Sequence, residues 1–449
     1  MSLKNITVKI LKKINPSSEE EKKIKTFVSE FVRISKTISG KEIVVCGSIG
    51  KFTWLKGDHD IDLFVVFPKE TERDELEEKG LEYGKRVIRE LRGREQIKYA
   101  EHPYVRGFVK GFVIDIVPCY GISEGENIIS AVDRSPLHLK YILNNLPEKS
   151  RDEARLLKQF CKGISVYGSD TKTEGFSGYI CELLIIKYGN FESVLKNAAN
   201  WAAGHKIDIE NNSEISFRDQ PLVIIDPIDK NRNAAANVNA ENFLKFVRKC
   251  DEFLKRPSEK FFFSKKEKLS GKEITTLKER ETLFVAYKMQ KPDIIDDILY
   301  PQLRRSLRRI ETMLNHEDFS AIRSYEFSDE KKAYMILELD IFSLPEIKKM
   351  IGPPIFVSKH VEEFKTKYKR TSVEGTRLVA EKNRDFPLAI DFLKNLQKLS
   401  SELLKEKGMP ENLVKEFKKS KLLEGKEFFA ELRKNQKLSE YIREKYFGE

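Results

Sequence analysis

Short apolar runs alternate with charged segments along the first third of the chain. The runs at 43–46, 63–67 and 112–117 are rich in Val, Ile and Phe and have the length of buried strands. The charged segment 70–91 favours a helix, and as a crossover it would bring the second and third runs into one sheet. Residues 1–140 are therefore predicted to form an α/β domain.

Helical patterns lie before and after this sheet. Ser18 followed by Glu21 is a capping-box pattern. The apolar positions that come next have helical spacing: Ile24, Phe27, Val28, Phe31 and Val32. From Leu137 to about Phe253 the pattern is mainly helical, with the clearest segments at 152–160, 179–188 and 240–253. Residues 141–262 are therefore predicted to be a mainly helical central domain.

The aromatic run 261–263 marks a junction to a third region. Strand patterns follow at 283–288, 333–339 and 377–381. Helix patterns lie between them, at 301–314 and, more briefly, at 360–368. From Asp391 onward the chain is helical and rich in lysine. This order predicts an open α/β sheet within residues 263–449, the third domain.

Three carboxylates stand where a metal-dependent phosphoryl-transfer enzyme needs them. Asp60 and Asp62 open a strand and share one of its faces, because successive side chains in a strand point to opposite sides. Asp115 is the single charge in the apolar run 112–117, which is costly unless it faces the same ions. Adjacent carboxylates repel one another without a cation, and hard oxygen ligands suit Mg²⁺ or Mn²⁺. A two-metal site is therefore expected.

A strand, a glycine turn and a helix start lie just upstream of this acidic pair. The strand at 43–46 runs into Gly47-Ser48, and residues 49–55 are predicted to begin a helix. In that arrangement backbone N–H groups and the Ser48 hydroxyl can face a triphosphate. A Gly-Ser pair alone is a weak signal, but it becomes strong together with the carboxylates that follow.

Two other interpretations of these residues carry less weight. Asp58, Asp60 and Asp62 have the opening spacing of a calcium-binding EF-hand loop, but Leu63 stands where that loop needs glycine. Alternatively, the acidic pair is an ordinary solvent-facing part of a strand and Gly47-Ser48 an ordinary turn. The agreement of three separate elements argues against coincidence.

These residues and several later motifs resemble one enzyme family. The Gly47-Ser48 pair with 53–57 and 60–62 resembles the polymerase-β-type nucleotidyltransferases. Motifs that resemble the narrower archaeal class I CCA-adding enzymes, or tRNA nucleotidyltransferases, lie at 99–104, 115–120, 130–134, 175–179, 226–227, 232–233, 291–293 and 300–303. The resemblance covers residues 20–385 or so. It implies a multidomain α/β and α+β fold, with a polymerase-β-like palm, a helical central domain and an α/β C-terminal RNA-binding region.

The resemblance also implies a reaction. In that family C, C and A are added without a template to the 3′ end of tRNA from CTP and ATP, by two-metal nucleotidyl transfer that releases pyrophosphate. Asp60, Asp62 and Asp115 would then be the catalytic residues and the ligands of two Mg²⁺ ions, with Mn²⁺ as a substitute. The partners would be CTP, ATP and the 3′ end and acceptor and T arms of tRNA.

Eight residues match the family's nucleotide-binding positions in their local motifs: Gly47, Ser48, Lys51, His102, His138, Lys158, Tyr167 and Arg232. Lys51 stands where relatives often have Arg, so the positive charge is kept but the bidentate fork is lost. Arg232 is expected to donate hydrogen bonds to the edge of the incoming base, since a guanidinium can reach acceptors on either base. Without the resemblance, His138 and Tyr167 would be interpreted as packing residues and Lys158 as a surface charge.

Rival functions share part of this pattern. A poly(A)-type or oligoadenylate-type nucleotidyltransferase would have the carboxylates without the motifs at 99–104, 175–179 and 291–293. An RNA-binding protein with an inactive palm is a third interpretation, against which the intact set of carboxylates argues. Incubation of tRNA lacking its 3′ end with labelled CTP or ATP and Mg²⁺ would discriminate among them.

Composition agrees with a nucleic-acid partner. The 449 residues include 82 Lys and Arg against 71 Asp and Glu, a net charge of +11 that favours a polyanion. The same charges would also suit a thermophile-like solvated surface. Five scattered cysteines without a Cys-x-x-Cys pair suggest a reducing cytoplasm. No apolar run has the length of a membrane span, so no membrane partner is expected, and a homodimer stays open.

Overall fold

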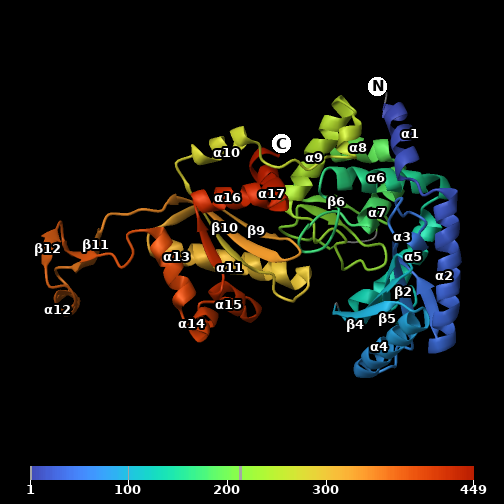
Figure 1. Cartoon of the computed structure of the whole chain (residues 1–449), viewed down its shortest axis with the longest axis horizontal. Helices are drawn as coiled ribbons and strands as arrows, with labels where there is room; N and C mark the ends of the chain where they lie inside the picture. Colours follow the sequence, from blue (N-terminus) through green and yellow to red (C-terminus); the bar gives the residue numbers. More distant parts are fainter. Residues whose placement is uncertain (1–2, 100, 212–214, 449) are drawn as a thin grey trace. The chain divides into compact units, whose positions relative to one another are not determined.

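The computed structural model describes residues 3–99, 101–211 and 215–448, which divide into two compact units, 1–264 and 265–449 (Figure 1). Ala100, within the motif at 99–104, lies outside the described residues. The predicted mixture of α/β and α+β architecture with a helical middle region is confirmed. The predicted boundary at 140 falls inside the first unit and stays a prediction.

The first unit contains a five-stranded sheet in the order β1-β2-β5-β4-β3. Its strands, in chain order, are β1 Glu42–Val45, β2 Asp60–Phe67, β3 Arg94–Tyr99, β4 Pro103–Val109 and β5 Phe112–Tyr120. The pair β2 and β5 is parallel, and the other neighbours are antiparallel. The prediction that these two strands share a sheet through a helical crossover is confirmed, although β3 and β4 were not predicted.

Helices α2 (Ser18–Ser39) and α4 (Arg73–Glu90) cover one face of this sheet. Helix α2 has the predicted amphipathic face, which buries Phe27 and Phe31, but its cap is Ser17 rather than Ser18. The side chains that pack under the helices include Ile61 and Leu63 of β2. Because side chains alternate along a strand, the intervening Asp60 and Asp62 belong to the opposite face.

The rest of the first unit is mainly helical, as predicted. Its helices are α1 Leu3–Ile14, α5 Arg134–Asn145, α6 Arg151–Gly163, α7 Gly178–Tyr188, α8 Phe191–Ala198 and α9 Ala240–Lys255, with a 3₁₀ turn at Ala131–Asp133. Two short parallel strands, β6 (His205–Ile207) and β7 (Leu222–Ile224), accompany them. One large apolar core holds this region together and includes an aromatic cluster centred on Phe160.

The second unit has an antiparallel sheet in the order β14-β8-β10-β9, with helices on both faces. Its strands are β8 Leu283–Gln290, β9 Ser320–Ser328, β10 Lys332–Ile341 and β14 Lys421–Glu424. Its helices are α10 Gly271–Lys278, α11 Asp296–His316, α13 Ala389–Lys398, α14 Ser401–Glu406, α15 Glu411–Lys418, α16 Lys426–Lys434 and α17 Gln436–Phe447.

A separate small sheet in the order β11-β13-β12 lies beside helix α12 (Figure 1). These elements are β11 Ile347–Pro354, α12 Ser358–Lys367, β12 Thr371–Glu374 and β13 Arg377–Asn383. The prediction of one open sheet for the strands near 283, 333 and 377 was therefore wrong. Strand β9, which was not predicted, pairs with β10 and occupies the edge, and β13 finds its partners in β11 and β12.

Among the described residues, no helix is long and apolar enough to cross a membrane.

Candidate active site

Three carboxylates lie on the face of the first sheet opposite α2 and α4. Asp62 of β2 is the direct register partner of Asp115 on the parallel strand β5, and Asp60 lies two residues earlier on the same face. Burial, together with the negative charges of Asp115 and Asp60, raises the pKa of Asp62 to about 6. Burial, with the charges of Asp58 and Asp115, also raises the pKa of Asp60. Because these negative charges repel one another, a nearby cation would stabilise the group.

Arg106 of β4 supplies one such cation. It is the register partner of Asp115, and its Nε and Nη2 donate to the two carboxylate oxygens over 2.7 and 2.6 Å. Within the described residues no group of three His, Cys, Asp or Glu side chains is already arranged around a metal position. The carboxylates nevertheless fit a divalent ion, since they offer hard oxygen donors from the adjacent strands β2 and β5.

The turn before β2 is shaped around Asp62. Gly47 has φ +62°, and a Cβ there would lie 1.9 Å from Oδ2 of Asp62, so only glycine fits. The helix predicted over 49–55 is a single turn, α3 (Gly47–Gly50), because Phe52 takes the left-handed conformation with φ 60°. The EF-hand interpretation is excluded, since Asp60 and Asp62 are part of β2 rather than of a loop.

Lys51 and Lys158, both predicted to bind the nucleotide, share a buried partner, Glu182 of α7. Nζ of Lys51 lies 3.0 Å from Oε2 of Glu182, and Nζ of Lys158 lies 2.7 Å from Oε1. The Thr53 hydroxyl donates to the same carboxylate over 2.5 Å and accepts from Lys158 over 2.7 Å. Burial raises the pKa of Glu182, but the two lysines and these hydrogen bonds outweigh it and lower the pKa to about 2. With both lysines protonated, the cluster carries one net positive charge.

Tyr167 and the start of α7 adjoin this lysine cluster. A Cβ at Gly178 would lie 3.0 Å from the Tyr167 hydroxyl and 3.4 Å from Nζ of Lys158, so both groups approach the first turn of the helix. Ser177 caps that turn by accepting from the backbone N–H of Ile180. The structure therefore brings Lys158 and Tyr167 together at the start of α7.

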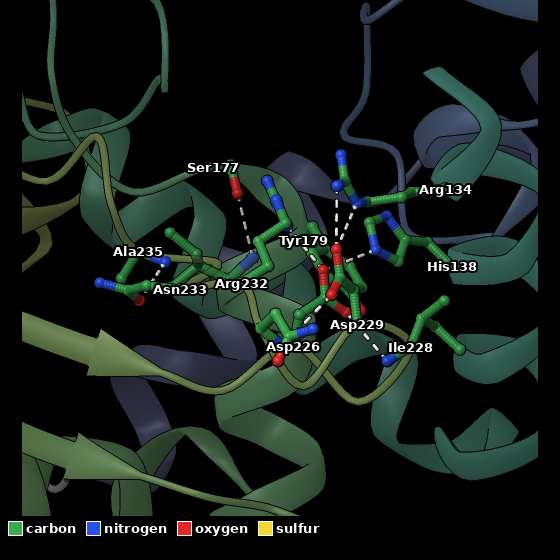
Figure 2. Close-up of polar contacts among 12 residues, drawn as sticks. Arg134, His138, Ser177, Tyr179, Asp226, Ile228, Asp229, Arg232, Asn233 and Ala235 are labelled. Atoms are coloured by element: carbon green, nitrogen blue, oxygen red, sulfur yellow. Dashed lines mark hydrogen bonds and ion pairs between the residues drawn. The ribbon is translucent and has the colours of Figure 1, made fainter. Parts of the chain in front are cut away.

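His138 and Arg232 meet at Asp226, a carboxylate without exposed surface (Figure 2). Nε2 of His138 lies 2.9 Å from Oδ2, and Nη1 of Arg232 donates to the same oxygen over 2.6 Å. The Tyr179 hydroxyl donates to Oδ1 over 3.1 Å, and its ring stacks on that of His138 at 4.0 Å. Nζ of Lys51 lies over the Tyr179 ring, 4.8 Å from its centroid. The residues around Asp226 therefore adjoin the lysine cluster.

His102 is not brought together with these residues. It is almost fully buried, and its Nδ1 lies 3.1 Å from Oε1 of Glu77 on α4. It directly precedes β4, four residues from Arg106, which corresponds to about 13 Å along a strand. Its Nε2 has no hydrogen-bond partner among the described residues.

Sequence reasoning missed the partners that hold the predicted residues: Arg106, Glu182 and Asp226. Glu182 had a usable signal, because it is the single charge in the apolar segment 180–186, the same feature that identified Asp115. Arg106 had no such signal in the sequence. Its role depends on the register between β4 and β5, and β4 was not predicted. Asp226 lay in a motif but carried no assigned role.

Comparison with known proteins covers most of the chain. Residues 21–138 match the nucleotidyltransferase domain, residues 152–263 the second domain of tRNA nucleotidyltransferase, and residues 280–425 the C-terminal domain of the CCA-adding enzyme. The chain is 39% identical over 422 residues to the CCA-adding enzyme of Methanocaldococcus jannaschii, covering 89% of this chain and 93% of the relative. It is 39% identical over 394 residues to that of Methanothermobacter thermautotrophicus, covering 86% and 87%. A solved structure of the Cid1 poly(U) polymerase overlaps 58% of this chain and 98% of its own, at TM-score 0.46 and 12% identity.

Proposed function

This chain belongs to the CCA-adding enzymes, and on that premise we propose how its own residues add C, C and A to the 3′ end of tRNA. Membership of this family confirms the resemblance inferred from the motifs. The match over 280–425 to a domain of CCA-adding enzymes also decides against the poly(A)-type and oligoadenylate-type alternatives. The first sheet is accordingly the palm of a nucleotidyltransferase.

The register between Asp62 and Asp115 is the observation that carries the proposal. Two carboxylates face each other on neighbouring parallel strands, with Asp60 on the same face. We assign these three residues as ligands of divalent metal, which the family generally uses, and propose Mg²⁺ as the ion. When bound, such ions lower the pKa of an RNA 3′ hydroxyl and offset charge on a triphosphate. Each Asp115 oxygen accepts one hydrogen bond from Arg106 and keeps a second lone pair that could face an ion.

The triphosphate is proposed to lie beside the turn at Gly47 and the lysine cluster. Ser48 offers its hydroxyl there, and Lys51 with Lys158 offers positive charge that Glu182 holds in place. Tyr167 and His138 adjoin the same region through Gly178 and Tyr179. These side chains bind and orient the nucleotide, whereas His102 lies apart from them in this structure.

Base choice is proposed to depend on Arg232. Its side chain is 36% exposed, and it extends from a loop that packs against α5 and α7 through Asp226. A guanidinium carries several donors in a fixed plane, so it can meet acceptors on the edge of cytosine or adenine. The second unit, 265–449, is proposed to bind the body of tRNA through its phosphates. All five cysteines are free and buried, which agrees with our proposal of a cytoplasmic site of action.

Transfer from labelled CTP and ATP onto tRNA lacking its 3′ end, with Mg²⁺, tests this assignment. Asp62→Ala and Asp115→Ala are expected to abolish transfer while leaving tRNA affinity close to that of the unchanged protein, because the loss falls on the metal. Asp58→Ala is the matched control: Asp58 is nearby, but it pairs with Lys162 and should retain turnover. Near-normal turnover of either first variant would remove these residues from the metal site.

A further inference from the structure

Asp226 collects hydrogen bonds from separate parts of the first unit (Figure 2). Its Oδ2 faces Nε2 of His138 on α5 and Nη1 of Arg232, and its Oδ1 accepts from the Tyr179 hydroxyl on α7 and from the backbone N–H of Ile228. Burial raises the pKa of Asp226, but His138, Arg232 and the Ile228 N–H together lower it to about 2. The carboxylate is therefore ionised at neutral pH although no part of it is exposed.

The contact with Asp226 uses only one of the nitrogen donors of Arg232. Among the described residues, Asp226 alone bonds to the guanidinium side chain, and it does so through Nη1. The remaining N–H groups of the planar fork stay available on a side chain that is 36% exposed. One edge of the guanidinium is thus fixed while the other can meet a ligand.

The backbone around Arg232 is fixed as well. The Asn233 side chain accepts from the backbone N–H groups of Ile224 and Ala235 and donates to the carbonyl of Leu222, which ties the loop to β7. The backbone N–H of Asp226 donates to the carbonyl of Arg232, which closes the loop on itself. Neither the start nor the end of the Arg232 side chain is therefore free to move far.

From these contacts we infer that Asp226 is the positioning residue for base choice. This inference rests on the proposed role of Arg232 in that choice. Asp226 holds the guanidinium in one orientation against the incoming nucleobase, so that acceptors on cytosine and adenine are met and the wrong bases leave buried donors unpaired. It also joins the base side of the site to the phosphate side. Tyr179, which it holds, lies between His138 and Lys51.

The test is nucleotide discrimination by Asp226→Asn, a substitution that keeps size and removes charge. The kcat/KM values for CTP, ATP, UTP and GTP are measured on tRNA ending just before each added position. We expect the ratios of right to wrong nucleotide to fall by about 10-fold, the effect of losing a charged hydrogen bond. In an Arg232→Ala background the same change should lower the ratios no further, because Asp226 acts through Arg232.

Asp229→Asn is the matched control. Asp229 lies in the same loop and is paired with Arg134 over 2.9 Å, but it makes no side-chain contact with the guanidinium of Arg232 among the described residues. It should leave the ratios unchanged, whereas an equal loss in this variant would mean that any weakening of the loop suffices and would overturn the inference.

Two further outcomes separate the inference from the function on which it rests, and a replacement variant covers a failure to fold. If Arg232→Ala lowers the ratios and Asp226→Asn does not, the inference fails and the role of Arg232 stands. If Arg232→Ala itself leaves the ratios unchanged, the proposed role of Arg232 fails, and the inference with it. If Asp226→Asn does not fold, Arg232→Lys is measured in its place. An ammonium lacks the planar fork of a guanidinium, so the nucleotide ratios of this variant should match those of Arg232→Ala. Ratios equal to those of the unchanged protein would overturn the inference.

Discussion

Arg106 and Asp115 face each other across the antiparallel strands β4 and β5, joined by two hydrogen bonds of 2.7 and 2.6 Å. The same Asp115 faces Asp62 on its other side. The guanidinium therefore offsets the charge of the acidic group in the absence of a metal ion. A bound ion would share the oxygens of Asp115 with this guanidinium.

Arg106→Ala should make the protein depend more strongly on divalent metal. Without the guanidinium, repulsion between Asp115 and Asp62 is uncompensated, and the metal-free protein should lose about 1–2 kcal/mol of unfolding free energy. Added Mg²⁺ should restore most of this loss. Thermal unfolding with EDTA and with Mg²⁺ measures the difference, and Arg94→Ala, on the edge strand β3, is the control. An equal Mg²⁺ effect in both variants would contradict this role of Arg106.

Gly47→Ala should lower turnover by about two orders of magnitude, the effect of displacing a reacting group by about 1 Å. The new methyl group would meet Oδ2 of Asp62 at 1.9 Å and move that carboxylate. Gly40→Ala is matched to it, because Gly40 has nearly the same φ, +63°, but no atom within 4 Å of its added Cβ. Both variants carry the backbone strain, and only the first should lose activity. Equal activities would show that the contact with Asp62 does not matter.

Glu182→Gln should change how stability depends on pH. The folded pKa of Glu182, about 2, lies below the usual 4.5, so its stabilising effect is complete above about pH 4.5 and is lost as the pH falls toward 2. The variant should lose about 3 kcal/mol at pH 7, since Lys51 and Lys158 keep their buried charges without a partner. Its stability should also fall less steeply between pH 4.5 and 2. Acid unfolding followed by circular dichroism gives both values, and an unchanged slope would count against this ion-pair cluster.

Affinity for tRNA should fall steeply with salt and depend on residues 265–449. If six or more phosphates are neutralised, affinity should drop roughly 10³-fold between about 50 and 200 mM salt. A fragment of residues 1–264, which has its own apolar cores, should retain CTP binding and lose most of its tRNA affinity. Comparable activity of this fragment on full-length tRNA would rule out the proposed role of the second unit.

The three carboxylates that we propose as metal ligands could be predicted from the sequence, because their placement follows local rules. Alternation along β2 places Asp60 and Asp62 on one face, and a lone charge in an apolar run identifies Asp115. Arg106 and Asp226 act through partners that only the tertiary fold brings near. Their importance therefore depends on strand register and helix packing, which one sequence does not specify.

The fold of the second unit also could be predicted only in part from the sequence. Strands β8 and β10 were predicted from their apolar runs, whereas β9 has a mixed pattern with exposed Arg323 and was missed. Without β9, the strand near 377 was assigned to the wrong sheet. Sheet membership is decided by hydrogen-bonding partners, and those are not encoded in the hydrophobic pattern of a single strand.

The Glu182 cluster also has a consequence for the order of events during folding. Lys51 and Glu182 are 131 residues apart in the chain, and Thr53 and Lys158 are 105 apart. Closing such long loops is entropically costly and slow compared with forming a local helix. The lysine cluster therefore forms only after α7 has been synthesised and has docked, whereas the three carboxylates all lie within the first 115 residues. A growing chain thus contains its proposed metal ligands well before it can form the cluster that we propose holds the phosphates of a nucleotide.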